Sequence, residues 1–270
     1  MLKLRLLTIA VVLPVFLAAL WLLPNGWWAL LLLLACLLAA HEWARLSGFD
    51  RAAESRFQAL LAAACIALWL AGGASRSVAA DAAALAERTL YALSALFWCV
   101  AAPLCLWRKF RVRGLTALCV GLVMLLPTWL ALTRMQHEPL QLLLIMGVVW
   151  IADSAAYFCG LAFGRRKLAP AISPGKTWEG VVGAFAAVAL YALMLDAADH
   201  GRHGVNVVIL GTAMTALSIV GDLFESLCKR QAGVKDSGSL LPGHGGLLDR
   251  IDALLAAAPL AALAALAFLR

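Results

Sequence analysis

Charged residues and glycines gather in residues 221–252, which read GDLFESLCKRQAGVKDSGSLLPGHGGLLDRID, while the sequence around them is strongly apolar. Charge beside lipid is costly and is kept mainly where it does chemistry. Asp222 and Asp249 stand near the two ends of this block, and carboxylates bind divalent cations through hard oxygen ligands. Clustered lysines and arginines bind phosphate, and this block contains Lys229, Arg230, Lys235 and Arg250. The pattern predicts a metal-assisted phosphoryl- or nucleotidyl-transfer site at a membrane surface.

The first part of this block has the spacing of one helical face. Asp222, Glu225, Ser226 and Lys229 recur at i, i+3, i+4 and i+7, so their side chains share a face. Glu225 and Lys229 have two interpretations, an ordinary ion pair at a helix end or a part of the site. Asp222 lies one turn deeper and follows Gly221, where a backbone or a ligand can approach closely. A buried acid there needs a cation or a hydrogen-bond partner.

The loop over residues 231–248 combines glycines with Lys235, Asp236 and His244. Glycines allow positive φ angles and let backbone N–H groups face an anion, so Gly245 and Gly246 are predicted to contribute to phosphate binding. The alternative is a flexible solvent-exposed loop. His244 has no second histidine or cysteine nearby, which argues against zinc. It is expected to bind phosphate or to orient a carboxylate, and Lys235 and Asp236 are expected to be catalytic.

Asp249, Arg250 and Asp252 begin the last apolar segment. Acids in the first turn of a helix are favoured by the helix dipole, which is their structural interpretation. The functional interpretation makes Asp249 a second metal ligand, brought beside Asp222 by the intervening loop. Two carboxylates on adjacent helix ends could bind one or two cations that bridge a triphosphate.

A second polar block, ISPGKTWEG at residues 172–180, precedes another apolar segment. It lacks the GxxxxGK[ST] spacing of a P-loop, and no strand is expected before it. Thr177 or Ser173 is predicted to cap the helix, whose first N–H groups would bind phosphate together with Lys176. The alternative is a simple helix start with a lysine that sets topology. Asp153 interrupts an apolar segment near its middle, and it is expected to face a polar cavity.

The composition predicts an all-α integral membrane protein. The chain has 270 residues, of which 64% are hydrophobic and 14% charged, against about half and a quarter in soluble domains. We expect one polytopic domain over 1–270, with less informative helices in 1–135 and the catalytic helices and loops in 139–270. About nine transmembrane helices are predicted, at residues 4–23, 27–46, 57–71, 90–107, 114–132, 139–163, 178–195, 205–228 and 251–269. The His41–Glu42 pair at the end of the second segment is interpreted as interfacial.

Basic residues predict the topology. With a cytoplasmic N-terminus, the inward-facing segments hold 17 of the 22 lysines and arginines, as the positive-inside rule requires. The C-terminus is then outside, and the charged block faces the cytoplasm. The net charge of +7 does not indicate nucleic acid, because no basic face interleaved with aromatic residues occurs on a soluble module. Seven scattered cysteines without a CxxC pair indicate neither a disulfide framework nor a zinc site.

Three motifs carry a resemblance to a known family. The pattern S-L-C-K-R-x4-K-D-x-G-x2-L-P-x-H-G-G-L-x-D-R-I-D at residues 226–252 closely resembles the signature of the phosphatidate cytidylyltransferase family, also called CDP-diacylglycerol synthases. The segments DSAAY at 153–157 and SPGKTWEG at 173–180 resemble further blocks of that family. Cys228 departs from the larger apolar residue usual there, and the charged positions are intact.

The resemblance implies a homodimer in the inner cell membrane that converts CTP and phosphatidate to CDP-diacylglycerol and pyrophosphate for phospholipid biosynthesis. It implies Mg2+ dependence, with K+ as a second cation at a paired-aspartate centre. Carried onto this chain, the metal ligands are Asp222 and Asp249. The residues expected to bind substrate are Asp153, Ser173, Lys176, Thr177, Arg230, His244, Gly245, Gly246 and Arg250, and Lys229 and Lys235 are expected to share in phosphate binding.

Two other functions remain as alternatives. A CTP-dependent lipid kinase would transfer the γ-phosphate to a polyprenol or another lipid, and its products would be a lipid phosphate and CDP. A secondary transporter would also contain buried acids. Against the transporter, the sequence has no internal repeat, and its charge gathers on one side of the membrane.

Overall fold

The computed structural model of the chain describes residues 13–72, 78–202, 204–238 and 245–268. Within these residues, eight helices are long and apolar enough to cross a membrane, and a shorter apolar helix, Leu13–Leu22, precedes them. The expected all-α membrane protein is confirmed. The helices are α2 (Asn25–Ser47), α3 (Arg51–Gly72), α4 (Val78–Leu96), α5 (Ala102–Arg108), α6 (Gly114–Met135), α7 (Pro139–Phe163), α8 (Trp178–Ala198), α9 (Val205–Gln231) and α10 (Leu248–Phe268).

Several helices are longer than their apolar residues predict. The segment expected at 57–71 is the 22-residue helix α3, which begins at Arg51. Its first turns were missed because they contain Arg51, Glu54 and Arg56, but charged side chains are tolerated where a helix leaves the bilayer. For the same reason α9 continues past residue 228 through Lys229 to Gln231. The predicted first span, 4–23, lies partly outside the described residues, so its full length stays a prediction.

A π-helical turn joins α4 to α5. The turn η1 (Phe97–Ala101) makes one continuous span from Asp81 to Arg108. Phe97 and Trp98, adjacent in sequence, both make edge-on contacts with Phe224 of α9, at centroid distances of 5.5 and 5.7 Å. Trp43 of α2 stacks on Phe224 from another side, at 6.4 Å. This aromatic cluster fixes α9 at Phe224, between Asp222 and Glu225.

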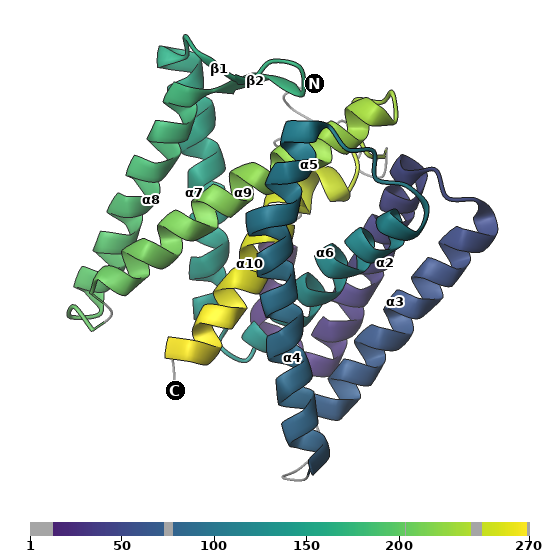
Figure 1. Cartoon of the computed structure of the whole chain (residues 1–270). Coiled ribbons are helices and arrows are strands. Elements are labelled where there is room, and N and C mark those ends of the chain that lie inside the picture. The colour runs from purple at the N-terminus through teal and green to yellow at the C-terminus, as the bar shows by residue number, and fades with distance from the viewer. Residues whose placement is uncertain (1–12, 73–77, 203, 239–244, 269–270) are drawn as a thin grey trace.

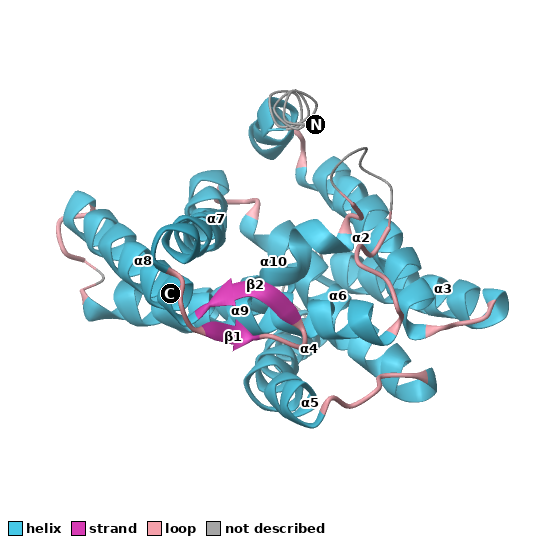
Figure 2. Cartoon of the chain, turned by 90° about the horizontal axis from the view of Figure 1, so that it is seen from above, coloured by secondary structure: helices cyan, strands magenta, loops and turns pink. Residues whose placement is uncertain are grey.

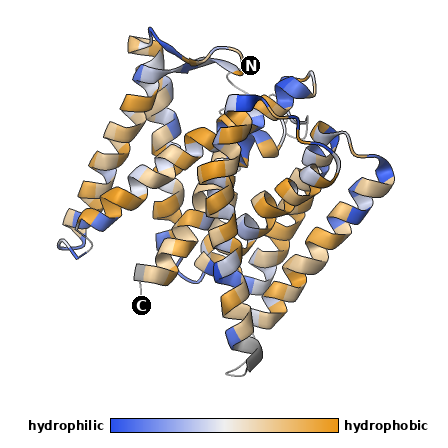
Figure 3. Ribbon diagram, viewed as in Figure 1, coloured by the Kyte–Doolittle hydropathy of each residue, from blue (hydrophilic) through white to orange (hydrophobic). Residues whose placement is uncertain are grey.

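The helices form a bundle whose polar residues gather mostly at the ends (Figures 1 and 3). Helix α7 packs on α8, and α9 packs on both α8 and α10. Helices α2, α3, α4 and α6 form the other part of the bundle, and α10 contacts both α4 and α6. The connections that follow α2, α5, α7 and α9 lie at one end of the bundle in Figure 1. These are the connections that the sequence predicts to be cytoplasmic.

A small β-hairpin replaces the loop expected between α7 and α8. Strand β1 (Lys167–Ala169) pairs antiparallel with β2 (Ser173–Thr177), with Lys167 opposite Thr177 and Ala169 opposite Ser173. The expectation that no strand precedes the SPGKT segment was therefore wrong. Seen from above, the hairpin lies across the end of the bundle beside α9 (Figure 2), and β2 contacts α7, α8 and α9.

Two side-chain contacts fix the hairpin to α8. The Thr177 hydroxyl accepts a hydrogen bond from the Gly180 N–H at 3.1 Å and so caps the helix, as the sequence predicts for one of its two candidates. The other candidate, Ser173, lies in β2, away from the helix start. The Glu179 carboxylate accepts hydrogen bonds from the N–H groups of Arg165 and Arg166. These bonds hold the base of the hairpin against the first turn of α8.

Helix α10 contains Pro259, which has no N–H to donate to the carbonyl of Leu255 four residues earlier. The hydroxyl of Thr128, on α6, lies 3.2 Å from that carbonyl oxygen and 2.7 Å from the carbonyl oxygen of Met124 in its own helix, so its single proton is shared between the two. Backbone polar groups inside a bilayer must be satisfied within the protein, and neighbouring threonines commonly do this where a proline interrupts a helix. The contact therefore joins α6 to α10 at a point where α10 lacks one of its own hydrogen bonds.

Candidate active site

Lys229 joins two carboxylates from different helices. Its ammonium group lies 2.6 Å from Glu225 Oε2 on α9 and 2.5 Å from Asp249 Oδ1 on α10. All three side chains are largely buried, with 13% of Lys229, 5% of Glu225 and 8% of Asp249 exposed. The expected helix-end pair of Glu225 and Lys229 is thus present, but Lys229 also holds Asp249. Burial makes both interactions stronger than a surface ion pair.

A second ion pair connects the hairpin to α9. The Lys176 ammonium of β2 lies 2.5 Å from Asp222 Oδ2, and about a quarter of each side chain is exposed. Asp153 of α7 interacts electrostatically with both of these groups. Asp252 of α10 interacts with Asp222, Asp153 and Glu225. Four elements therefore bring charged groups together at one end of the membrane-spanning helices, and the polar cavity expected at Asp153 stays a prediction.

The loop before α10 surrounds Asp249 with hydrogen-bond donors. Asp249 Oδ2 accepts hydrogen bonds from the N–H groups of Ser237 and Gly246, both at 2.9 Å, and the Ser237 hydroxyl oxygen lies 3.0 Å from it. The sequence predicts that glycine N–H groups of this loop face an anion. The anion that the Gly246 N–H contacts is a carboxylate of the chain itself. Gly245 has φ of +85°, a conformation that favours glycine.

We call the acids and lysines described above the charged cluster: Asp153, Lys176, Asp222, Glu225, Lys229, Asp249 and Asp252. Glu42 also belongs to it, although its place at the end of an apolar segment predicted an interfacial residue. It lies on α2 and is only 4% exposed. Its carboxylate accepts hydrogen bonds from the Ser237 hydroxyl and from the N–H groups of Leu247 and Leu248. The neighbouring His41 instead pairs with Glu54 of α3. An acid at the end of an apolar helix is a weak signal for a functional site, because such acids are common at interfaces.

The remaining predicted residues differ in their surroundings. Arg230 donates from Nε to the carbonyl of Ile172, 3.2 Å away, and so attaches α9 to the hairpin. Lys235 and Asp236 are exposed after the end of α9. Arg250 is exposed in the first turn of α10. His244 lies outside the described residues, so its predicted role stays a prediction.

Gly221 permits close packing of α9 on α10. A Cβ atom at this position would stand 2.5 Å from the carbonyl oxygen of Asp252 and 3.1 Å from Ala256 Cβ. The expected close approach at Gly221 is therefore made by the backbone of α10. The contact brings Asp222, the residue after Gly221, to a position on α9 that faces Asp252 on α10.

Asp222 and Asp249 have different lysine partners, Lys176 and Lys229 respectively. Among the described residues, no group of three or more His, Cys, Asp or Glu side chains is arranged to hold a metal ion. However, carboxylates outnumber lysines in these contacts. Excess negative charge that is buried away from water favours the binding of a further cation. Glu225 Oε1 is buried and makes no hydrogen bond with the described residues. The hard oxygen atoms and their charge therefore suit Mg2+.

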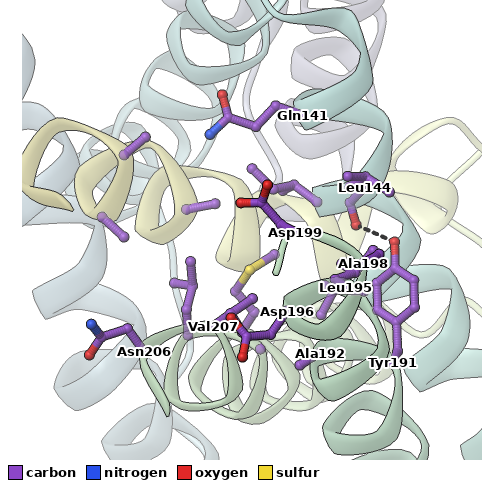
Figure 4. A pocket seen from close by; sticks show the side chains of 18 of the residues that line it. Gln141, Leu144, Tyr191, Ala192, Leu195, Asp196, Ala198, Asp199, Asn206 and Val207 are labelled. Atoms are coloured by element: carbon purple, nitrogen blue, oxygen red, sulfur yellow. Dashed lines mark hydrogen bonds between the residues drawn. The ribbon is translucent and has the colours of Figure 1, made fainter. Parts of the chain in front are cut away.

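A separate cavity lies at the other ends of α7 to α10. It has a volume of about 470 Å³ and is mostly apolar, with Gln141, Asn206, Asp196 and Asp199 among its lining residues. Figure 4 shows Tyr191 at its wall, where the hydroxyl donates to the carbonyl of Leu144. The residues of the charged cluster are at the opposite ends of these helices. The chemistry predicted from the sequence therefore belongs to a different part of the protein from this cavity.

Comparisons with known proteins agree on one family. Residues 3–268 match the model of the cytidylyltransferase family. The chain is 40% identical over 276 residues to the phosphatidate cytidylyltransferase of Pseudomonas aeruginosa. The aligned region covers 96% of this chain and 95% of that protein. It is 35% identical over 284 residues to the protein of the same name from Haemophilus influenzae, covering 96% of each. A phosphatidate cytidylyltransferase of Thermotoga maritima is 46% identical over 123 residues, 43% of this chain and 46% of that protein.

Proposed function

Because the chain belongs to the cytidylyltransferase family, we infer that it is a membrane-embedded phosphatidate cytidylyltransferase. It transfers the cytidylyl group of CTP to phosphatidate and forms CDP-diacylglycerol and pyrophosphate. The observation that carries this conclusion is the family match over residues 3–268, since it includes every described residue of the charged cluster. The paired lysines and carboxylates are chemically suited to a reaction between two phosphate-containing substrates.

The reaction forms one phosphorus–oxygen bond and breaks another. A phosphate oxygen of phosphatidate attacks the α-phosphorus of CTP, and the bond from that phosphorus to the β-phosphate breaks to release pyrophosphate. A phosphate monoester is largely ionised near neutral pH, so the nucleophile needs no strong general base. The contribution of the protein is to position the two substrates and to stabilise negative charge.

Cationic side chains on three elements would bind the phosphates. Lys176 on β2 and Lys229 on α9 are fixed by carboxylates, so their ammonium groups are held in place before substrate arrives. Arg230, exposed Lys235 and exposed Arg250 stand at the ends of α9 and α10, where they would bind the outer phosphates. The first N–H groups of α8, behind the Thr177 cap, would add a further anion site.

Asp222 and Asp249 would hold Mg2+ through carboxylate oxygens. Mg2+ is commonly bound by one or two carboxylates together with substrate phosphates, which agrees with a cluster that has no complete ligand set among the described residues. When bound, the ion supplies charge neutralisation of the triphosphate and of the leaving group. K+ as a second cation at this centre remains part of the proposal.

The position of the site in the membrane is also part of this proposal. The chain is a multi-pass membrane protein, and we place it in the inner membrane with the charged cluster facing the cytoplasm, where CTP is available. The excess of lysine and arginine on that side supports the placement. We further propose a homodimer. Crosslinking in native membranes should then give a species of twice the mass of one chain.

One assay tests the reaction and separates it from the alternatives. Purified chain is incubated with phosphatidate, Mg2+ and CTP labelled in its α-phosphate. A cytidylyltransferase moves the label into a lipid product and releases unlabelled pyrophosphate. A CTP-dependent lipid kinase leaves the label in CDP, and a transporter leaves CTP unchanged. Absence of labelled CDP-diacylglycerol from an active, folded preparation would contradict the proposed function.

A further inference from the structure

Glu42 reaches the charged cluster from the N-terminal half of the chain. Its Oε2 atom accepts hydrogen bonds from the Leu248 N–H at 2.7 Å and from the Ser237 hydroxyl at 2.8 Å. Its Oε1 atom accepts one from the Leu247 N–H at 2.9 Å. A buried carboxylate is costly unless it is hydrogen-bonded. The three donors satisfy Glu42, and all of them come from the loop and helix start that carry Asp249.

Two of these donors lie at the start of α10. The first N–H groups of a helix have no partner within that helix, and the positive end of the helix dipole attracts a carboxylate. Glu42 therefore caps α10 from a different helix, across 206 residues of sequence. Asp249 is the second residue of α10, so the cap acts one residue from the proposed metal ligand.

Ser237 connects the two carboxylates directly. Its hydroxyl oxygen lies 2.8 Å from Glu42 Oε2 and 3.0 Å from Asp249 Oδ2. The N–H of Ser237 also donates to Asp249 Oδ2. A displacement of Glu42 would therefore release both the hydroxyl and the helix start, and Asp249 would lose the surroundings that orient its oxygen atoms.

Two glycines provide independent evidence that the Glu42 carboxylate determines the shape of this loop. A Cβ atom at Gly238 would lie 2.5 Å from Glu42 Oε1. A Cβ atom at Gly246 would overlap both the Ser237 hydroxyl and Glu42 Oε2. These residues are thus small because Glu42 occupies the adjacent space. The loop is built around this carboxylate from both of its ends.

We propose that Glu42 is a positioning residue for Asp249: it caps α10 and holds Ser237, and through them it orients the Asp249 carboxylate. The inference rests on the proposed function, in which Asp249 binds the metal. In this role Glu42 acts through Asp249 and not on the reacting atoms. If Glu42 positions Asp249, its loss should change the Mg2+ dependence of the reaction and also speed hydrogen exchange of the backbone amides around Asp249. A residue that only stabilises the fold would not change both together.

The test uses the full chain with Glu42→Gln, which keeps the shape of the side chain but removes the charge and one acceptor oxygen. The kcat at saturating CTP and phosphatidate should fall about ten- to hundredfold, since hydrogen bonds to charged groups are the stronger ones. The Mg2+ concentration for half-maximal activity should rise. The matched control is Glu54→Gln, because Glu54 contacts His41, the neighbour of Glu42, on the same end of the bundle. It should retain the wild-type kcat and Mg2+ dependence.

Hydrogen exchange gives a second measurement. Peptides containing residues 245–252 should exchange faster in Glu42→Gln than in wild type, while peptides from α7 remain unchanged. Unchanged kcat and Mg2+ dependence would overturn the inference. Lower activity without faster exchange at these amides would also overturn it, because Glu42 would then act on the substrate itself. A wild-type chain that makes no CDP-diacylglycerol would instead overturn the proposed function.

Ser237→Ala tests the same inference if Glu42→Gln fails to fold. This variant removes only the hydroxyl between the two carboxylates and leaves the helix cap intact, so kcat should fall about fivefold to tenfold, as for one lost hydrogen bond. An unchanged kcat would overturn the inference. Where both variants fold, the double variant should lose less than the product of the two single losses. Independent effects would contradict a shared action on Asp249.

Discussion

Lys229 stabilises two buried carboxylates that would otherwise lie close together without a counter-ion. It supports Glu225 from the same helix and Asp249 from the next one. Lys176 has the corresponding role for Asp222, from a strand of the hairpin. Both lysines therefore have two possible partners, the carboxylates of the resting protein and the phosphates of a substrate. A divalent cation bound together with CTP would neutralise the carboxylates when the lysine ammonium groups bind phosphate.

Asp222→Asn and Asp249→Asn should each lower kcat about a hundredfold or more. The amide keeps the shape of the side chain but loses the charge that holds a dication, and the neutralisation lost is worth several kcal/mol. CDP-diacylglycerol formation at saturating Mg2+ measures the effect. Asp50→Asn is the matched control, because Asp50 is an exposed aspartate that caps α3 through the Ala53 N–H. Near wild-type turnover in either site variant would remove that residue from the metal site.

Lys176→Ala should lower kcat/KM for CTP about ten- to hundredfold, the equivalent of about 1.5–3 kcal/mol for one charged phosphate contact. Lys176→Arg should restore only part of it, because a planar guanidinium does not replace a compact ammonium beside Asp222. Steady-state kinetics with both substrates provide the measurement. Lys167→Ala, an exposed lysine on the paired strand, should have no effect. Unchanged kinetics in Lys176→Ala would leave Lys176 as a residue that only sets topology.

At the level of helices, the close contact of α9 with α10 determines where the acids face one another. Gly221 allows the contact, and the aromatic cluster around Phe224 holds the next turn of α9. The π-helical turn widens the helix at the point where Phe97 and Trp98 both reach Phe224. Such turns often occur at functional sites, and here one supports the polar end of α9.

Gly221→Ala should destabilise the protein by about 1–3 kcal/mol, as expected for overpacking a close interface. Because the added methyl group meets the backbone of Asp252, the helices must separate, and turnover should fall as Asp222 shifts. Thermal unfolding in detergent and CDP-diacylglycerol formation measure the two effects. Gly26→Ala is the control, since its Cβ would make only an ordinary contact of 3.4 Å with Trp69. Wild-type stability in Gly221→Ala would contradict the tight contact.

Across the full bundle, the connections after α2, α5, α7 and α9 share one end, where the hairpin and the charged cluster also lie (Figure 1). A single cysteine at Val234 should therefore react with impermeant thiol reagents only from the cytoplasmic side. One at Arg202 should react only from the opposite side. Both residues are exposed, and the test uses a background in which the native cysteines are replaced. Labelling of both from one side would contradict the predicted orientation.

The sequence could predict the helices, most charged residues of the site and the Glu225–Lys229 pair, because hydropathy and i,i+4 spacing are local. It could not predict that Lys176 meets Asp222, because that contact depends on the β-hairpin. The strands of the hairpin are too short and too polar to be recognised from the sequence. Glu42 was missed because its partners are about 200 residues away in sequence. Gly238 and Gly246 were expected to supply backbone freedom, but the structure shows that they mainly provide space for Glu42.

The bond from Thr128 to the carbonyl of Leu255 has a consequence for the biogenesis of the protein. Helix α10 is synthesised after α6, and Pro259 leaves it with a backbone acceptor that lipid cannot satisfy. Helix α6 carries a hydroxyl that can share its proton with this acceptor, and α6 is already made when α10 emerges from the ribosome. Helix α10 is therefore more stable against α6 than alone among lipids. Because α10 also carries Asp249, the proposed metal site forms only once α10 has packed against the bundle, and the Thr128 contact favours that packing.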